Sequence, residues 1–501
     1  MNDVAAAGRL IRSCWVLLRA DVLIPREVDP VLPPSVRAVA RTLRIFAGPT
    51  SRDGRPGQRL AKAFEGLGPA TIKLGQVLST RADIFGREFA DDLGHLKDQL
   101  PPFPTAVAKA TIADTLGQPV ESLFTEFSEP IAAASLAQAH SARLADGRKV
   151  AVKVLRPGIE RRVANDLEML ALAARLAERF VEPARRLEPV GAIATVARSM
   201  TLELDLRLEA AGASELREIM AEDQFMRAPR IVWPGVGKRA LTIEWAQGVA
   251  LSDPAALDQP GIDRRGLADN LVRAFLAQAL DHGVFHADLH EGNLFVSAPA
   301  VVTAVDFGII GRLDAVARRH LAEILWGFLQ RDYTRVAKAH FDAGYVPAHH
   351  SLAAFAQALR AVGEPSIGRA SAEVSMGRLL GLLFEITAIF DMKLRPELVL
   401  LQKTMVTVEG VARRIDPTHN LWASAEPVVK RWITRELSPV TRAREMADDI
   451  TRIIKALARQ LDPPPMAPIV VVKRAPPGLL WFVLGVAVAG LAFLATAYLS
   501  H

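Results

Sequence analysis

The sequence predicts an α+β fold of two lobes, a small lobe that carries strands and a larger, predominantly helical lobe. Residues 131–157 leave helical periodicity for a strand, a turn at Asp146–Gly147 and a second, valine-rich strand. A further strand pair is expected at 230–234 and 239–245. From about residue 264 to 460 the pattern is helical apart from one short apolar hairpin. Residues 60–100 and 105–128 are expected to be helical as well, so a helical extension precedes the lobes.

The apolar hairpin carries the most specific motif of the chain. His286-x-Asp288 is followed five residues later by Asn293, and after thirteen more residues by Asp306-Phe307-Gly308. This order and spacing match the catalytic loop and the metal-binding triplet of the protein-kinase fold. Asn293 and Asp306 offer hard oxygen ligands suited to Mg²⁺. Asp288 can orient or deprotonate the attacking oxygen, and His286 is expected to brace the loop backbone.

The strand after the Asp-Gly turn ends in Val150-Ala151-Val152-Lys153, where kinases place the lysine that contacts the α- and β-phosphates. This lysine needs a carboxylate partner, and both Glu168 and Glu209 are candidates. We therefore expect ATP or ADP with Mg²⁺ to bind between the two lobes. Where kinases carry a glycine-rich loop, this chain has a stiffer turn, made of Ala132, Ala133, Ala134 and Ser135.

Composition restricts the possible partners. The net charge is +6, but basic residues are scattered among acidic ones and only 6% of residues are aromatic, so nucleic acid is not an expected partner. The mild positive charge favours an anionic membrane surface or a nucleotide, or reflects ordinary solvated helix faces. Cys14 is the only cysteine, which fits a reducing, cytoplasmic setting.

The two ends of the chain suggest membrane contact. The N-terminus reads as an arginine-containing amphipathic helix that ends before Pro25, not as a signal peptide. Leu479–Leu499 runs 21 residues without a charge, long enough to span a bilayer, with Trp481 and Tyr498 near its ends. Lys473 and Arg474 precede it, which predicts a single-pass anchor in the cell inner membrane with the body in the cytoplasm. A buried core helix is the alternative.

Four motifs occur in one order and together identify a family. They are the Lys-x-Gly-Gln block from Lys73 with its STRxD and PP sequel, the AAAS-x-AQ-x-H loop, the ELDxxxEA block and the HADxHxGN/DFG pair. The chain resembles the UbiB family of atypical kinase-like proteins, which is linked to ubiquinone (coenzyme Q) biosynthesis. The likeness covers residues 60–420 in rough terms, together with the C-terminal apolar segment.

The resemblance implies roles for residues outside the kinase motifs. Lys73 and Gln76 fill the signature that folds over the nucleotide cleft and blocks a peptide groove. Glu203 and Asp205 match a Glu-x-Asp motif whose glutamate pairs with the signature lysine, and Glu209 matches the partner of the strand lysine. On one continuous helix, positions 203 and 209 would diverge by about 120°, so two acids could serve two lysines. Glu209 is therefore preferred to Glu168 as the partner of Lys153. The alanine-rich residues 132–135 match the family's nucleotide loop.

The chain departs from the family pattern at two positions of the catalytic loop and in its C-terminal apolar segment. Leu289 and Glu291 stand where the family often has prolines. Neither side chain is expected to bind the metal, so the predicted effect is small. Many bacterial members end in two membrane helices, whereas this chain has room for one clear span.

These observations predict the following organisation. An amphipathic helical region is expected at 1–48, a helical extension with the Lys-x-Gly-Gln motif at 49–128, a kinase-like N-lobe at 129–248, a helical C-lobe at 249–462 and a transmembrane helix at 479–499.

The resemblance implies a membrane-anchored ATPase of kinase-like fold that supports ubiquinone synthesis. The bilayer is an expected partner, as are prenylated quinone intermediates and ubiquinone-synthesis enzymes. One alternative is a phosphotransferase that acts on a small molecule or a lipid. Another is a catalytically idle scaffold that binds nucleotide, which the intact set Lys153, Asp288, Asn293 and Asp306 argues against.

Deletion of residues 479–501 tests the anchor. We expect the shortened protein to leave the membrane fraction, because the deletion removes the 21-residue apolar span. The measurement is the distribution of the protein between membrane and soluble fractions. Persistent membrane association would assign the attachment to the N-terminal helix or to another surface.

Overall fold

The computed structural model describes most of the chain. Its described residues are 3–23, 25–31, 34–48, 53–79, 86–94, 96, 100–180, 185, 188–367, 386, 389–392 and 396–436. The predicted span Leu479–Leu499 lies outside them. Within the described part of the chain, no helix combines the length and the hydropathy needed to cross a bilayer.

Contacts divide the described residues into two compact units. The first unit holds the residues up to 210 together with 231–245, and the second holds 211–230 together with 246–436. Strand β4 therefore belongs to the first unit although a stretch of the second precedes it in the chain.

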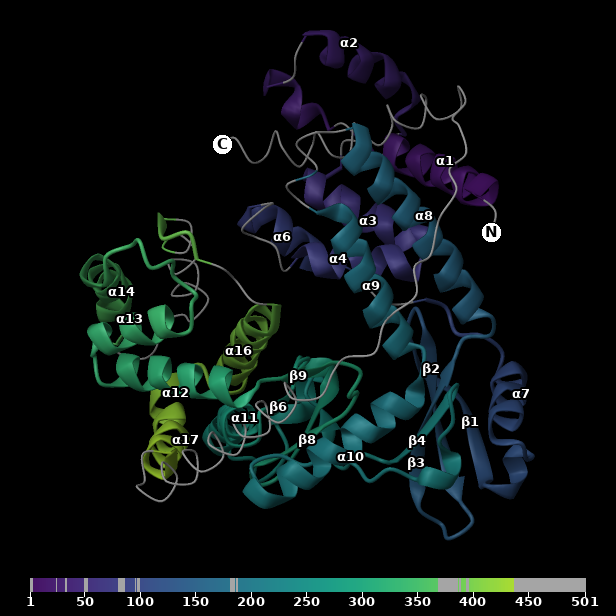
Figure 1. The fold of residues 1–501 in the computed structure, drawn as a ribbon. Coiled ribbons are helices and arrows are strands. Elements are labelled where there is room, and N and C mark those ends of the chain that lie inside the picture. Colours follow the sequence, from purple (N-terminus) through teal and green to yellow (C-terminus); the bar gives the residue numbers. More distant parts are fainter. Residues whose placement is uncertain are drawn as a thin grey trace, which may run out of the picture. The chain divides into compact units, whose positions relative to one another are not determined.

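A four-stranded antiparallel sheet lies in the first unit (Figure 1). Its order is β1-β2-β3-β4, with bounds Phe124–Ala133, Ala137–Leu144, Lys149–Leu155 and Ala240–Glu244. Val150, Val152 and Val154 are fully buried on one face, where they pack with Ile112 of the helix α7 (Thr105–Leu116). Because side chains alternate along a strand, Lys153 projects from the opposite face.

The helices of the first unit precede the sheet or follow β3. Ala6, Leu10 and Cys14 of the first helix are buried against Met169 and Leu172 of α8, so the amphipathic N-terminal segment packs its apolar face on the body of its own unit. The bounds are α1 Asp3–Arg19, α2 Pro34–Leu43, α3 Pro56–Leu67, α4 Pro69–Ser79, α6 Arg87–Gly94, α8 Ile159–Phe180 and α9 Pro189–Glu203. Short 3-10 turns span Arg26–Val31, Arg44–Phe46, Val120–Ser122 and Trp233–Gly235. Helix α10 (Leu206–Asp223) begins in this unit and ends in the second.

The second unit consists of small sheets and a set of helices. One sheet has the order β5-β7-β8 and another pairs β6 with β9. The strand bounds are β5 Val249–Ala250, β6 Val284–His286, β7 Leu294–Ser297, β8 Val301–Ala304 and β9 Ile310–Arg312. The helices are α11 Arg264–Ala277, α12 Ala315–Leu329, α13 Tyr333–Asp342, α14 Leu352–Ile367, α16 Pro396–Ile415 and α17 Leu421–Glu436. Short 3-10 turns span Pro254–Leu257 and Glu291–Asn293, and a π-helical turn spans Gln278–His282.

Several expectations for local structure are confirmed and two are wrong. The strand, the Asp146–Gly147 turn and the valine-rich strand are present as β2 and β3. A single helix across 105–128 is wrong, because Gly117 adopts a left-handed conformation (φ 70°) that ends α7, and β1 begins at Phe124. The expected strand at 230–234 is reduced to one bridge, between Ile231 and Ile243, before a 3-10 turn.

Candidate functional site

The strand lysine of the first unit has a carboxylate partner. Lys153 Nζ lies 2.9 and 3.0 Å from the two carboxylate oxygens of Glu209, near the start of α10. Glu168, the other candidate, pairs instead with Arg9 at 3.1 Å. The Glu209 carboxylate is well shielded, since its side chain is 10% exposed against 29% for Lys153. A two-point contact on a shielded carboxylate fixes the position of the ammonium group along the sheet face.

The signature lysine has a different carboxylate. Lys73, on α4, forms an ion pair with Glu203 at the end of α9, and Ser199 Oγ donates to the same carboxylate at 3.1 Å. Gln76 lies half-buried one turn further along α4. The Lys73–Glu203 pair therefore links α4, which carries the Lys-x-Gly-Gln signature and is called the signature helix below, to α9.

Glycines explain how closely the signature helix packs. A Cβ at Gly75 would lie 2.2 Å from Leu96 Cδ1 and 3.0 Å from Phe64, so a side chain there would force α4 away from its neighbours. Gly68 precedes α4 with φ 134°, and a Cβ there would lie 2.8 Å from a carboxylate oxygen of Asp166. Burial raises the pKa of that Asp166 carboxyl to about 6. The start of α4 is thus held tightly against α8.

Asp205, the second acid of the Glu-x-Asp motif, interacts with Arg207. It accepts a hydrogen bond from the backbone N–H of Arg207 at 3.1 Å and pairs with the Arg207 guanidinium at 2.6 Å, which lowers the pKa of the Asp205 carboxyl. In the described structure it pairs with neither lysine but caps the first turn of α10. Helix α9 ends at Glu203 and α10 starts at Leu206, so the assumption of one continuous helix is wrong. Glu203 and Glu209 lie on either side of this break and pair with different lysines.

The alanine-rich segment forms a tight strand connection. Ala132 and Ala133 are the last residues of β1, and Ala134 N donates to Ala137 O at 2.8 Å. Arg156 Nε closes the turn by donating to Ala134 O at 2.8 Å, and Ser135 is buried. Half of the predicted loop is therefore strand, and the remainder is a short turn held by a side chain from beyond β3.

Two residues of the same motif brace the segment and were not assigned a role from sequence. Gln138 exchanges two hydrogen bonds with the backbone of Phe103, at 2.8 and 3.1 Å, which attaches the proline-rich segment 101–104 to β2. His140 is buried, its Nδ1 lies 2.8 Å from Ser128 O, and its Nε2 lies 2.9 Å from Gln138 Nε2. Burial lowers the pKa of His140, so the neutral ring donates from Nδ1 and accepts at Nε2. Their place in the AQ-x-H pattern, two apart on a strand, was the available signal.

In the second unit, two antiparallel pairs bring the catalytic loop and the DFG triplet together. On one side, β6 pairs with β9 with His286 opposite Ile310, and Ala287 N donates to Ile309 O at 3.0 Å. On the other side, β7 pairs with β8 with Leu294 opposite Ala304, and Val305 N donates to Asn293 O at 2.9 Å. The register therefore places Asn293 next to the triplet that begins at Asp306.

His286 is the buried connection between the two loops. It is 0% exposed, and its Nδ1 accepts the backbone N–H of Asp288 at 3.1 Å. Its Nε2 consequently carries the proton and donates to Val305 O at 3.2 Å. Burial lowers the pKa of His286, which keeps this neutral tautomer. The expectation that His286 braces the loop backbone is confirmed.

Asp288 and Asn293 face each other across the loop. Asn293 Nδ2 lies 3.1 Å from Asp288 O and 3.4 Å from Asp288 Oδ2. These bonds use the amide nitrogen, so the amide oxygen is the atom suited to a metal. The Asp288 side chain is 40% exposed, and His290 Nε2 lies 3.7 Å from its Oδ2.

Asp306 adopts a backbone conformation that few residue types accept. Its φ is +60°, in the left-handed region that aspartate tolerates better than most residues, and Gly308 N lies 3.3 Å from its Oδ1. Its side chain is exposed beside the buried Phe307. An exposed carboxylate next to the amide of Asn293 forms an oxygen-rich donor set that fits Mg²⁺.

Helix α16 and the π-helical turn both form hydrogen bonds with the backbone of the catalytic loop. Thr404 Oγ1, on α16, donates to Ala287 O at 3.2 Å, and Gln278 Oε1 accepts the backbone N–H of His286 at 3.0 Å. Glu291, one of the two departures from the family pattern, forms an ion pair with Arg414 at the end of α16. Leu289, the other departure, is fully buried. Thr404 and Arg414 lie more than 100 residues after the catalytic loop, so sequence reasoning gave no reason to connect them with it.

Comparisons with known proteins agree with this geometry. The chain matches the ABC1 atypical kinase-like domain over residues 95–340 and the UbiB helical domain over residues 359–420. A solved structure from Mycobacterium tuberculosis, described as the complex of Rv3197 with erythromycin, has 22% sequence identity and a TM-score of 0.51. That match covers 74% of this chain and 94% of the other, and it supports the kinase-like fold alone.

Two curated relatives extend the match over most of the chain. A protein of Marinobacter nauticus named "Probable protein kinase UbiB" is 40% identical over 438 residues, which is 86% of this chain and 79% of that protein. A Pseudomonas aeruginosa protein of the same name is 38% identical over 456 residues, covering 89% of this chain and 85% of that protein. The chain therefore belongs to the UbiB family of atypical kinase-like proteins.

Proposed function

We propose that this protein is a membrane-anchored, Mg²⁺-dependent ATPase of kinase-like fold that supports ubiquinone biosynthesis. The observation that carries the proposal is the two-point contact between Lys153 and the Glu209 carboxylate, at 2.9 and 3.0 Å. A strand lysine fixed by a helix carboxylate is the arrangement with which kinases hold the α- and β-phosphates of ATP. Lys153 binds these phosphates, and Glu209 is a positioning residue that fixes the Lys153 ammonium group.

Further roles fall to the catalytic loop and the Asp-Phe-Gly triplet, which both lie in the second unit. Asn293 and Asp306 would hold Mg²⁺ through their side-chain oxygens, and the metal, when bound, neutralises the charge of the phosphates. Asp288 is partly exposed and accepts a proton from the attacking water or small hydroxyl. His286 keeps the loop backbone fixed through its two hydrogen bonds during this transfer.

Two features favour ATP turnover over transfer to a protein. The Lys73–Glu203 pair fixes the signature helix on α9, and the family resemblance assigns Lys73 and Gln76 to a segment that excludes peptide substrates. The alanine-rich residues 132–135 replace a glycine-rich loop, and Arg156 closes their turn.

The link to ubiquinone rests on family membership, and the membrane anchor rests on the uncharged run Leu479–Leu499.

The proposal is tested by quinone profiling in a deletion strain that is rescued with wild type or with Asp288→Asn. Asparagine cannot take up the proton at this position, so we expect wild type to restore ubiquinone and the variant to leave intermediates accumulated. The measurement is the amount of ubiquinone and of its precursors in lipid extracts. Full rescue by Asp288→Asn would instead support a nucleotide-binding scaffold, and a phosphorylated product with membrane extract would support a phosphotransferase.

Asp306→Asn tests the metal role. Asparagine tolerates the left-handed backbone at φ +60° as aspartate does, so the substitution removes the charge without straining the loop. We expect the thermal shift induced by Mg²⁺-ATP to disappear, because the amide binds Mg²⁺ more weakly than the carboxylate. Asp258→Asn, on an exposed residue that pairs with Arg264, is the control and should keep the shift. An unchanged shift in Asp306→Asn would contradict the metal role.

Glu209→Gln, compared with Glu168→Gln, tests the choice between the two carboxylates. Loss of the Glu209 charge frees Lys153 from its position, and we expect ATP turnover to fall by up to about 100-fold. Glu168→Gln removes a half-exposed pair with Arg9 and should leave turnover close to wild type. The measurement is phosphate release by the two purified variants. Equal losses in both, or a loss in Glu168→Gln alone, would reject the assignment of Glu209.

A further inference from the structure

Three potential metal ligands converge in the second unit, in a region that the proposed phosphoryl-transfer chemistry does not use. His349 and His350 lie in the connection between α13 and α14, and Asp391 lies in the described segment 389–392. His350 Nε2 is 3.1 Å from Asp391 Oδ2, and His349 Nε2 is 3.7 Å from the same oxygen. The three ligand atoms lie within 4.8 Å of one another.

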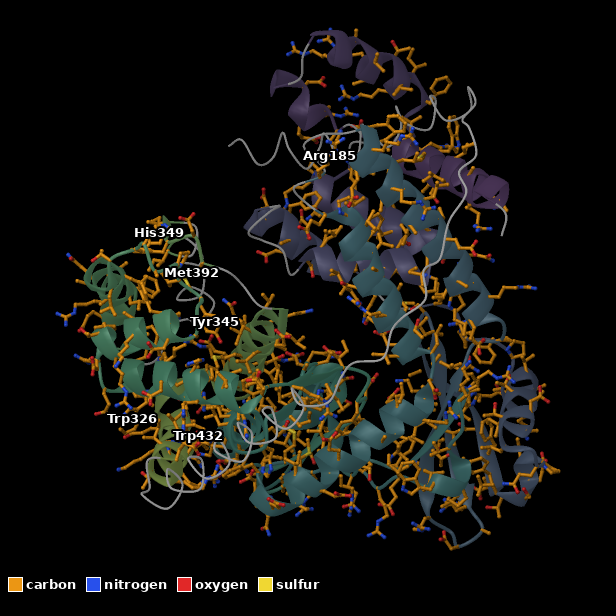
Figure 2. All side chains as sticks on the ribbon, viewed as in Figure 1. Arg185, Trp326, Tyr345, His349, Met392 and Trp432 are labelled. Carbon is orange, nitrogen blue, oxygen red and sulfur yellow. The ribbon has the colours of Figure 1, made fainter. Side chains whose placement is uncertain are left out.

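The cluster is attached to the core through its neighbours in sequence. Phe390 is buried among Tyr333 and Phe355, so the residue before Asp391 is fixed in the hydrophobic core of this unit. The His350 ring packs on Phe390 with 5.3 Å between centroids. Figure 2 labels His349 and, as the residue after Asp391, Met392, both in the part of this unit that contains α13 and α14. The His350 ring is therefore packed and Asp391 follows a packed residue, while the side chains of His349 and Asp391 are 67% and 68% exposed.

The backbone conformation of Asp391 and the close approach of the two histidine rings add to this positioning. Asp391 adopts φ +48°, a left-handed conformation that directs its side chain back toward the histidines. The rings of His349 and His350 lie with centroids 4.1 Å apart and planes inclined by 39°, and both Nε2 atoms face the same carboxylate oxygen. Consecutive histidines in an extended chain would point to opposite sides.

The spacing fits a tetrahedral metal. Zinc binds imidazole nitrogen and carboxylate oxygen at about 2.0–2.2 Å, which places two ligands of a tetrahedral site about 3.3–3.5 Å apart. The observed 3.1 and 3.7 Å lie on either side of that value. Hydrogen bonding alone accounts for the His350 contact but not for His349, since 3.7 Å is too long for a hydrogen bond.

The ligand set selects the kind of ion. Two imidazoles and one carboxylate suit Zn²⁺ and similar transition metals, whereas Mg²⁺ prefers oxygen ligands and retains its water. The proposed Mg²⁺ ligands Asn293 and Asp306 contain no imidazole. The two sites therefore differ in chemistry as well as in sequence position.

We propose that His349, His350 and Asp391 form a zinc site, with water in the fourth position. The ion would fasten the connection between α13 and α14 to the chain that leads into α16. Helix α16 contacts the catalytic loop through Thr404 and Ala287, so the site would stabilise the support of that loop. The inference does not depend on the proposed ATPase function.

The experiment uses the purified full chain, stripped of metal by a chelator and then titrated with Zn²⁺ in the absence of nucleotide. We expect one zinc per chain and a rise in the unfolding temperature, because an ion that binds the folded state stabilises it. His349→Ala, His350→Ala and Asp391→Asn should each weaken zinc binding by at least about tenfold. Magnesium at millimolar concentration should neither bind at the site nor displace the zinc.

His282→Ala is the matched control. His282 lies 3.5 Å from Asp223 and 3.9 Å from Glu222, so this variant also removes an imidazole that faces carboxylates. It should keep the zinc stoichiometry and the thermal shift of wild type. An equal loss in this control would show that zinc binds nonspecifically to surface histidines.

A second measurement covers the case in which a ligand variant fails to fold. Cobalt added to the metal-free wild-type protein should give the visible absorption of a tetrahedral site, and Zn²⁺ should abolish that absorption. Absence of the cobalt spectrum, or absence of bound zinc in wild type, would overturn the proposal. Unchanged zinc affinity in Asp391→Asn would also overturn it, because the histidine pair alone would then account for the binding.

Discussion

The catalytic half of the second unit depends on one buried, neutral imidazole. His286 accepts the backbone N–H of Asp288 at one nitrogen and donates to Val305 O from the other, so a single ring fixes both the catalytic loop and the strand that leads to Asp306. Because the ring is fully buried, a charged form would be costly, and burial lowers its pKa accordingly. The tautomer follows from the two hydrogen bonds, and the loop conformation follows from the tautomer.

In the first unit, one short stretch of chain provides two lysines with two separate carboxylates. A break between α9 and α10 separates Glu203 from Glu209, and Asp205 stabilises that break by capping the new helix. Lys73 and Lys153 can then be fixed independently, one on a helix and one on a strand. On one continuous helix, the orientation of a single helix axis would set the positions of both carboxylates.

Much of the local structure could be predicted from the sequence, because the evidence for it is local. The period-2 pattern with its Asp-Gly turn predicted β2 and β3, and the motif spacing predicted the hairpin that brings Asn293 next to Asp306. The helix within 105–128 was predicted but its end at Gly117 was not, although Gly117-Gln118-Pro119 is typical of a helix end. The choice of Glu209 agreed with the structure although the helix argument behind it did not.

The supporting contacts could not be predicted, because they join residues that only the fold brings together. Thr404 reaches Ala287 across 117 positions of the chain, and His350 reaches Asp391 across 41. Neither pair belongs to a recognisable pattern of spacing. Gln138 and His140 are an intermediate case, since the motif contains them but their bracing role appears only with the positions of Phe103 and Ser128.

The ion pair between Glu291 and Arg414 changes what keeps the catalytic loop rigid. A proline at this position, as the family resemblance implies, would restrict the backbone covalently and without regard to the solvent. Here the restraint is electrostatic, between side chains that are 31% and 43% exposed. Dissolved ions screen such a pair, so we expect its contribution to the loop to weaken as the ionic strength rises, which the contribution of a proline would not do.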